Sequence, residues 1–311
     1  MPSVNERKLP TSAPSTGALE RDPHRAGSDH GRPIGAAKSI RAYAAAVRHA
    51  AASCHDRSLV ARLGRGERRL VFIVGSPRSG TTFLGRTIGG IPGFADLSEV
   101  TPLKAAIPRL AALPQAQAAE RIGQILERVR HLALVHTLRS VEQTPETSFV
   151  LPAALLAYPE GRALHIVRDG RDVVCSLLER GWLRSGRSGR DDARHPFGAQ
   201  ARFWVEPDRI EEFEQASDAA RAAWAWRRYV EAVRQVDEGV LELRYEQMVT
   251  DHESAASAIA SHLGTDPAPI LAGLTYASDR SIGRYPHDLT PEQLADVERE
   301  AGPLLRELGY S

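Results

Sequence analysis

Residues 70–84 read LVFIVGSPRSGTTFL, and this stretch decides the fold of the chain. Its first five residues are apolar, as in a buried strand, and they lead into a turn bracketed by Gly75 and Gly80. Two threonines follow the turn, and a helical pattern begins at Phe83. A strand, a turn and a helix in this order gather backbone N–H groups and the positive end of a helix dipole around one point. The stretch therefore predicts an anion-binding loop.

The spacing of this loop is close to that of the nucleotide phosphate loop G-x-x-x-x-G-K-[ST], from Gly75 through Gly80 to Thr82. Thr81 stands where that motif has its lysine, and the basic residue of the loop is Arg78 instead. A loop without the lysine can hold a phosphate but lacks the group that reaches the β and γ phosphates in Mg-assisted phosphoryl transfer. The pattern therefore favours phosphate binding over a kinase reaction.

The composition bounds the class of protein. The 311 residues are 42% hydrophobic, which suffices for the core of one large α/β domain or two small ones. The net charge of +1 gives no case for a nucleic-acid partner or an anionic membrane. Only three of the 40 basic residues are lysines, and arginine suits a bidentate grip on phosphate or sulfate oxygens.

Cysteine usage and hydropathy bear on the compartment. Cys54 and Cys175 show no pairing pattern, which favours a reducing environment. The N-terminal region has no apolar segment of the kind found in secretion signals, and no run approaches the length of a membrane span. We therefore expect a cytoplasmic protein without stable membrane insertion, while the oligomeric state stays unknown.

The periodicity of the sequence gives the order of its elements. Residues 1–35 are rich in Pro, Ser, Gly and Arg, and we expect a disordered tail before a single domain over 36–311. Helices are predicted over 34–63, 83–88, 116–132, 171–180, 217–237, 251–263 and 291–308. Strands are predicted over 69–74, 163–167 and 240–244, with a short extended stretch over 139–142. This alternation predicts an α/β fold of the P-loop-like, three-layer type, a central parallel sheet flanked by helices, with ligands at the carboxyl ends of the strands.

Two further segments join the loop as candidates for the site. Residues 168–176 read RDGRDVVCS directly after a predicted strand, and residues 281–285 read SIGRY in a polar turn. Together with the loop, they resemble the sulfotransferase family that uses 3′-phosphoadenosine 5′-phosphosulfate (PAPS). The resemblance covers residues 70–311 and is closest to bacterial and Golgi-type members, whose phosphosulfate loop is P-R-S-G-T-T. The combination of segments is specific, although each piece alone is not.

The resemblance implies that PAPS is the donor, that adenosine 3′,5′-bisphosphate is the product and that no metal takes part. Arg78 would lie near the oxygen that bridges phosphate and sulfuryl group, where negative charge builds as the bond breaks. Arg168 and Ser176 would hold the 3′-phosphate, and Arg180, one helical turn beyond Ser176, lies on the same face. The 5′-phosphosulfate would be cradled by Pro77, Arg78, Ser79, Gly80, Thr81 and Thr82.

Other roles follow from the same resemblance. Ser281, Gly283 and Arg284 match the C-terminal element that closes over the nucleotide, and Tyr245 matches a tyrosine beside the adenine. Glu99, after the first helix of the domain, matches the glutamate that takes the acceptor proton.

The acceptor side of the expected site carries one departure from the family. Relatives commonly have a lysine where Gln143 stands, and the amide can still donate a hydrogen bond. The polar residues 181–208 are too many for a simple connection, and we expect them to form a loop on the acceptor side. The acceptor would be a hydroxyl of a carbohydrate, a lipid or a natural product.

Several of these residues also have purely structural interpretations. Arg168 can pair with a neighbouring aspartate, Ser176 can bond to its own helix, and Tyr245 can belong to the core. Glu99 can cap a helix or face solvent. Arg171, Asp172 and at least one of Trp224 and Trp226 are expected to be structural. The histidines lack metal-ligand spacing, and His195 is a fallback base.

Two other functions stay open on the sequence alone. One is a P-loop kinase for a small molecule, which requires Mg and a lysine that reaches the phosphates. The other is a nucleotide-binding protein that has kept the pocket and lost the chemistry, and Gln143 keeps this alternative open. Dependence on Mg would favour the first alternative.

Overall fold

A computed structural model describes residues 36–53, 64–184 and 202–310. The tail expected over 1–35, residues 54–63 of the first predicted helix and residues 185–201 of the expected acceptor-side loop lie outside the described residues, as do Cys54 and His195. The described residues belong to one compact unit. None of the helices within them is long and apolar enough to cross a bilayer.

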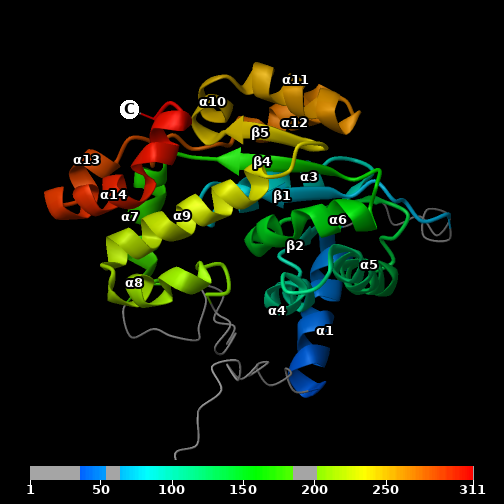
Figure 1. Ribbon diagram of the computed structural model, residues 1–311. Helices are drawn as coiled ribbons and strands as arrows, with labels where there is room; N and C mark the ends of the chain where they lie inside the picture. Colours follow the sequence, from blue (N-terminus) through cyan, green and yellow to red (C-terminus); the bar gives the residue numbers. More distant parts are fainter. Residues whose placement is uncertain (1–35, 54–63, 185–201, 311) are drawn as a thin grey trace, which may run out of the picture. The chain divides into compact units, whose positions relative to one another are not determined.

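The centre of the structure is a sheet of five parallel strands in the order β2-β3-β1-β4-β5. Figure 1 shows this sheet between the helices, with β1, β4 and β5 side by side. The strands are β1 (Val71–Val74), β2 (Phe94–Ser98), β3 (Arg139–Glu142), β4 (Arg162–Val167) and β5 (Val240–Arg244). From β1 the chain first fills the sheet on one side with β2 and β3, and then on the other with β4 and β5. The topological switch point therefore lies at the carboxyl end of β1, where ligands bind in open α/β sheets. The predicted parallel sheet is confirmed.

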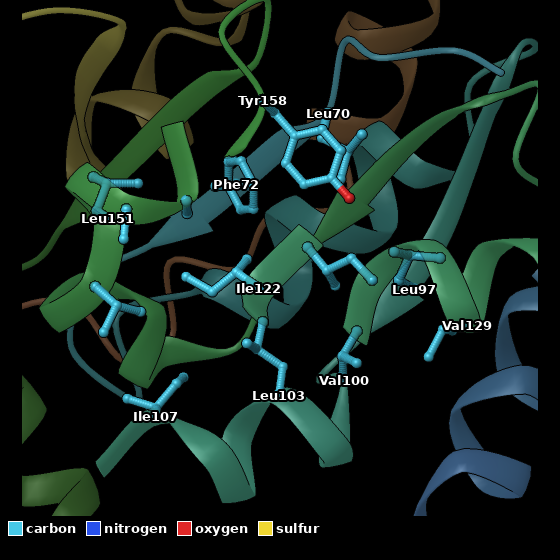
Figure 2. Close-up of a cluster of buried hydrophobic side chains, with 14 of the residues drawn as sticks. Leu70, Phe72, Leu97, Val100, Leu103, Ile107, Ile122, Val129, Leu151 and Tyr158 are labelled. Carbon is cyan, nitrogen blue, oxygen red and sulfur yellow. The ribbon is translucent and has the colours of Figure 1, made fainter. Parts of the chain in front are cut away.

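Strand β1 is apolar throughout because helices cover both faces of the sheet. Leu70, Phe72 and Val74 contribute to a core cluster on one face, and Figure 2 shows part of it. Val71 and Ile73 contribute to a second cluster on the other face. A strand buried on both faces reads as a continuous apolar run rather than an alternation.

The helices divide between these two faces. The first cluster includes residues of α1 (Ala36–Ser53), α4 (Thr101–Leu110), α5 (Gln115–Leu132) and α6 (Leu151–Ala157). The second includes residues of α3 (Thr81–Gly89), α10 (Tyr245–Thr250), α11 (His252–Leu263) and α12 (Pro267–Leu274). The sheet is thus the middle of three layers, as the sequence predicts.

Helix α9 (Asp218–Arg234) is buried on two sides, which settles the place of both tryptophans. Trp226 packs with α7 (Gly170–Arg180) and α14 (Pro291–Glu307), whereas Trp224 packs with aromatic residues around α8 (Ile210–Gln215). Both side chains are 1% exposed or less. The expectation that at least one of them is structural is confirmed, since both belong to the core.

Several short elements are absent from the sequence-based prediction. They are β2, α4, α6, α8, α10, α12, α13 (Tyr285–Asp288) and the 3₁₀ helices η1 (Pro145–Val150) and η3 (Pro207–Arg209). Helix α4 contains Pro102 and Pro108, which obscure its pattern although Pro102 stands in the first turn, where proline is tolerated. The longer predicted helices are found, with α1 described from Ala36 to Ser53.

Candidate active site

The loop that follows β1 brings backbone N–H groups together at the start of α3. Ser79 N–H donates to the carbonyl of Ser76 at 3.1 Å, and Gly75 N–H donates to the hydroxyl of Ser148 at 3.1 Å. Gly80 precedes the helix, and no side chain caps its N-terminus. The Ser79 hydroxyl is buried and has no hydrogen-bond partner within the described part of the chain. Free donors at a helix N-terminus and an orphaned hydroxyl are suited to an anion.

Gly80 is required by its surroundings. Its φ of 104° lies in a region that L side chains rarely adopt. A Cβ at this position would lie 2.8 Å from Cδ2 of Tyr245 and 3.1 Å from Cδ1 of Ile166. The Tyr245 ring is therefore packed directly against the loop.

Arg78 turns back from the loop onto helix α7. Its backbone is left-handed, with φ of 72°, which is uncommon for a residue other than glycine. Its Nε donates to the hydroxyl of Ser176 at 3.0 Å, and its guanidinium lies 5.8 Å from the ring centroid of Trp182. Non-glycine residues in such conformations concentrate at functional sites. The structure thus joins two residues that the resemblance assigns to opposite ends of the nucleotide.

Arg168, at the carboxyl end of β4, is the point where the three candidate segments meet. Its Nη1 donates to the carbonyl of Arg78 at 3.3 Å, and its Nη2 donates to the carbonyl of Ser281. The guanidinium lies 5.2 Å from the ring centroid of Tyr245 and 3.8 Å from the carboxylate of Asp172. Its buried Nε has no hydrogen-bond partner among the residues described. A buried cation with an unused donor is suited to binding an anionic oxygen.

The backbone of Arg168 is held by Trp226, a contact that sequence reasoning did not predict. The indole N–H donates to the Arg168 carbonyl at 3.1 Å. The ring also lies where a Cβ on Gly170 would fall, at 2.7 Å. A core tryptophan therefore sets the position of the turn between β4 and α7.

The remaining residues of the C-terminal turn do not all point to Arg168. The N–H groups of Gly283 and Arg284 donate to the carboxylate of Asp172, at 2.7 and 2.9 Å. The side chain of Arg284 pairs with Glu179 and Asp288. Within this turn, the carbonyl of Ser281 makes the contact with Arg168.

Arg180 and Tyr245 lie beside these contacts. Arg180 is exposed, and its guanidinium lies 6.0 Å from the Trp182 ring centroid, so Trp182 contacts both this arginine and Arg78. The Tyr245 hydroxyl donates to the carbonyl of Ser278 at 2.8 Å, and burial raises the pKa of this phenol. Tyr245 therefore belongs to the core and also faces the loop.

Glu99 comes after α3 in the chain, as the sequence indicates, and strand β2, which was not predicted, lies between them. The cap of helix α4 is Val100, and Glu99 accepts a hydrogen bond from Nζ of Lys104 at 2.9 Å. Lys104 also lies 3.3 Å from the carboxylate of Glu146, and only 2% of its side chain is exposed. Lys104 was not singled out from the sequence, although its rarity in this arginine-rich chain was a signal.

Gln143, where relatives commonly have lysine, points away from open space. Its Nε2 donates to the hydroxyl of Ser98 at 3.2 Å, and its Oε1 is buried without a hydrogen-bond partner among the described residues. Oε1 lies 2.4 Å from where a Cβ on Gly85 would be. The amide thus fills the space between the end of β2 and helix α3.

A second ionisable group near Glu99 is fully buried. Glu142, the last residue of β3, accepts hydrogen bonds from the N–H of Thr144 at 2.8 Å and the hydroxyl of Thr147 at 2.9 Å. Burial raises the pKa of the Glu142 carboxyl to about 7, although these hydrogen bonds act to lower it.

Cys175 on α7 is also affected by burial, which raises the pKa of its thiol to about 12. This thiol is therefore no nucleophile at neutral pH.

The residues that the structure describes contain no cluster of metal-binding side chains. Over residues 36–53, 64–184 and 202–310, no three His, Cys, Asp or Glu side chains are grouped so as to hold a metal ion. Two guanidinium groups lie at the loop, that of Arg78 within it and that of Arg168, which donates to the Arg78 carbonyl. The arrangement is therefore one for holding an anion by guanidinium and backbone donors.

Comparison with known proteins gives one family. The chain matches the family model described as the sulfotransferase family over residues 71–269. No curated protein matches significantly.

Among solved structures with a similar chain trace are three sulfotransferases or sulfotransferase domains. The sulfotransferase domain of the Synechococcus PCC 7002 olefin synthase is 17% identical, with 78% of this chain and 96% of that chain covered and a TM-score of 0.48. Mouse sulfotransferase SULT7A1, complexed with PAP, is 18% identical, with 82% and 90% covered and a TM-score of 0.45. Sulfotransferase STF1 from Mycobacterium tuberculosis H37Rv is 16% identical, with 85% and 84% covered and a TM-score of 0.43.

Proposed function

The chain belongs to the sulfotransferase family, and on that premise we propose that it transfers a sulfuryl group from PAPS to an acceptor hydroxyl. The observation that carries the proposal is the meeting of three distant segments at Arg168, whose guanidinium donates to the carbonyls of Arg78 and Ser281. Two buried polar atoms, Arg168 Nε and Ser79 Oγ, have no hydrogen-bond partner among the described residues. Both carry a hydrogen that can be donated to a phosphate oxygen, so the residues present fit the binding of PAPS.

The donor would be held at both of its ends. The loop 77–82 would bind the 5′-phosphosulfate through the N–H groups at the start of α3. Arg168 and Ser176 would bind the 3′-phosphate, with Arg180 at the exposed edge. The Ser176 hydroxyl accepts its hydrogen bond from Arg78, so its own O–H is left to donate to a phosphate oxygen.

The remaining nucleotide contacts would come from the core and the C-terminal turn. The Tyr245 ring, packed against Gly80, would lie beside the adenine. Ser281, Gly283 and Arg284 would lie over the nucleotide from the other side. Support for this placement comes from the contact between the Ser281 carbonyl and the Arg168 guanidinium.

The reaction is a displacement at sulfur in which one S–O bond forms and another breaks. The acceptor oxygen attacks the sulfuryl sulfur in line with the bridging oxygen, and the electron pair of the broken bond leaves with adenosine 3′,5′-bisphosphate. Arg78 would stabilise the charge on the bridging oxygen, and this interaction counts most in the transition state. Glu99 would take the proton of the acceptor hydroxyl, held in place by Lys104. The fixed guanidinium supplies the positive charge, so the proposal includes no metal ion.

The acceptor class follows from the family rather than from a described pocket. We propose that the acceptor is a hydroxyl of a carbohydrate, a lipid or a natural product. No nucleic acid enters the proposal because the net charge of the chain is +1.

The first test is calorimetric binding of adenosine 3′,5′-bisphosphate, 5′-AMP and ATP in the presence of EDTA. We expect tighter binding of the bisphosphate, with the preference over 5′-AMP lost in Arg168→Ala. Arg86→Ala is the matched control, because Arg86 is exposed on α3 and carries the same charge. Equal affinity for bisphosphate and 5′-AMP in the unaltered protein would contradict the proposal. Binding of ATP alone, and only with Mg, would favour a kinase.

A further inference from the structure

Asp172 lies in the first turn of α7, and its side chain is hydrogen-bonded to the backbone of the C-terminal turn 281–285. Its carboxylate accepts hydrogen bonds from the N–H groups of Gly283 at 2.7 Å, Arg284 at 2.9 Å and Tyr285 at 3.1 Å. The Asp172 side chain is fully buried. Three N–H groups that converge on one carboxylate form an anion nest, and here a side chain of the same chain fills it.

The conformation of the turn produces this nest. Gly283 is left-handed, with φ of 68°, and Arg284 is right-handed, with φ of −81°. Successive residues of opposite hand direct their N–H groups to one side, which is the geometry of a nest. The turn therefore cannot keep these hydrogen bonds if Gly283 leaves the left-handed region.

A neighbouring residue holds the same turn by a different contact. The guanidinium of Arg171 lies 4.1 Å from the ring centroid of Tyr285 and pairs with Asp169 at 2.8 Å. Arg171 and Asp172 are therefore both used to fix residues 283–285 against α7. Neither contact involves an atom that the proposed function assigns to the nucleotide's phosphates or sulfuryl group.

The turn that Asp172 fixes is also the turn that contacts Arg168. The carbonyl of Ser281 accepts from Arg168 Nη2, and the Asp172 carboxylate lies 3.8 Å from the same guanidinium. The position of Arg168 therefore depends on where Asp172 holds the turn. If the turn were displaced, the Arg168 guanidinium would move with it. The loop at 77–82 would keep its position, because β1 and α3 hold it.

We propose that Asp172 is a positioning residue for the 3′-phosphate: it holds the turn 281–285, and the turn sets the Arg168 guanidinium. This inference rests on the proposed function, since it takes Arg168 as the ligand of that phosphate. It assigns to the second aspartate of the RDGRD segment a task in binding, where the sequence indicated only a structural one.

The test uses the opposite signs of two effects in Asp172→Asn. Removal of a negative charge near Arg168 would by itself strengthen binding of a phosphate. Loss of the nest would instead loosen the turn and weaken binding, because the amide retains one acceptor oxygen for three N–H groups. We expect binding of adenosine 3′,5′-bisphosphate to weaken on the order of tenfold, and binding of 5′-AMP to change less than about twofold. Unchanged or tighter binding of the bisphosphate overturns the inference.

Two glycine variants repeat the test without touching the buried carboxylate. Gly283 is exposed, and a Cβ there would meet nothing within 4 Å, so only backbone strain distinguishes its substitutions. Valine strongly disfavours the left-handed region, whereas asparagine adopts it more readily than other non-glycine residues. We expect Gly283→Val to reproduce the selective loss of bisphosphate binding, and Gly283→Asn to lose clearly less of it. Equal behaviour of the two variants would contradict the inference.

A spectroscopic readout separates positioning from general instability. In ³¹P NMR of adenosine 3′,5′-bisphosphate bound to Asp172→Asn, we expect the 3′-phosphate resonance to move toward the chemical shift of the free bisphosphate. The 5′-phosphate resonance of the same molecule stays in place and serves as the internal control. Equal movement of both resonances would show a general loosening and would overturn the specific role.

Failure of the inference and failure of the proposed function give different results. If the unaltered protein binds bisphosphate and 5′-AMP equally, the proposed function fails. If it prefers the bisphosphate and Asp172→Asn keeps that preference, only the inference fails. Glu179→Gln is the control for charge, since Glu179 pairs with the partly exposed side chain of Arg284 and not with the backbone of the turn. We expect the preference to persist in this variant.

Discussion

Arg78 and Ser176 are 98 positions apart in the sequence and are joined by a hydrogen bond of 3.0 Å from Nε to Oγ. Arg78 belongs to the loop after β1, and Ser176 lies on the helix after β4. These strands are neighbours in the sheet, so the segments that follow their carboxyl ends meet. The bond couples the residue proposed for the bridging oxygen to one proposed for the 3′-phosphate.

The first prediction is that Arg78 and Ser176 act as a unit. We combine Arg78→Lys and Ser176→Ala in a double-mutant cycle, measured by calorimetric binding of adenosine 3′,5′-bisphosphate. We expect a coupling free energy of about 1–2 kcal/mol between the two substitutions. The reason is that lysine lacks the Nε–H group with which Arg78 donates to Ser176. Ser261→Ala on α11, at an exposed position, is the control partner and should be additive with Arg78→Lys. Additive effects of Arg78→Lys and Ser176→Ala would show that the contact does not contribute to binding.

The second prediction concerns the fit of Gly80 against the tyrosine behind it. Gly80→Ala adds a Cβ at 2.8 Å from Tyr245, and we expect a loss of stability of about 2–4 kcal/mol together with loss of nucleotide binding. Gly93→Ala is the control, since Gly93 also has a positive φ of 85° but nothing lies within 4 Å of its Cβ position. Urea unfolding of both variants measures the difference. Equal losses would mean that backbone strain alone, and not the contact with Tyr245, makes glycine necessary.

The third prediction concerns the buried lysine beside the proposed base. Lys104→Met leaves Glu99 and Glu146 without the ammonium group that lies 2.9 and 3.3 Å from them, and we expect a loss of about 3–5 kcal/mol in the free energy of unfolding. The double variant Lys104→Met/Glu146→Gln should recover much of that loss, because the buried carboxylate is then removed as well. Lys104→Met that unfolds at the same urea concentration as the unaltered protein would contradict the prediction.

The fourth prediction is a dependence of stability on pH that arises from Glu142. Burial raises the pKa of this carboxyl from 4.5 in the unfolded chain to about 7. The folded protein therefore binds more protons than the unfolded chain between these values, so this group's contribution is complete below the lower pKa and is lost as pH rises through about 7.

The size of the Glu142 effect can be measured by urea unfolding at about pH 5 and about pH 8. We expect the free energy of unfolding to fall by on the order of 3 kcal/mol from this group, and the fall to shrink in Glu142→Gln, which stays neutral. Glu120→Gln, at an exposed position of α5, is the control and should keep the pH dependence. An unchanged dependence in Glu142→Gln would show that this carboxyl is ionised in the folded protein across the range.

The parts of the fold that the sequence predicts are those with strong local signals. Strand β1, helix α3 and helix α7 follow from apolar runs, turns and periodicity within single segments. Strand β2 was missed because four of its five residues are buried and one of these is Asp96, so neither alternation nor an apolar run marks it. Its pairing with β3 supplies the missing information, and local patterns do not carry such pairings.

The site divides in the same way. The loop at 75–82, Arg168, Ser176 and the turn at 281–284 were named from the sequence, and the structure brings Arg78, Ser176, Arg168 and Ser281 into contact. Lys104, Asp172 and Trp226 were not named as parts of the site. Each acts through a contact between side chains or backbone groups of separate elements, and a single sequence does not show which elements meet.

The sequence by itself determined the family, the parallel α/β fold and the anion-binding loop, because these depend on residues close together along the chain. The tertiary structure decided where the charged and polar side chains go: Glu99 lies against Lys104, the Gln143 amide against Gly85, and Asp172 beneath the C-terminal turn. A buried charged group must find partners wherever the fold provides them, since an unpaired one costs several kcal/mol. Those partners are fixed only when the strands have taken their places in the sheet.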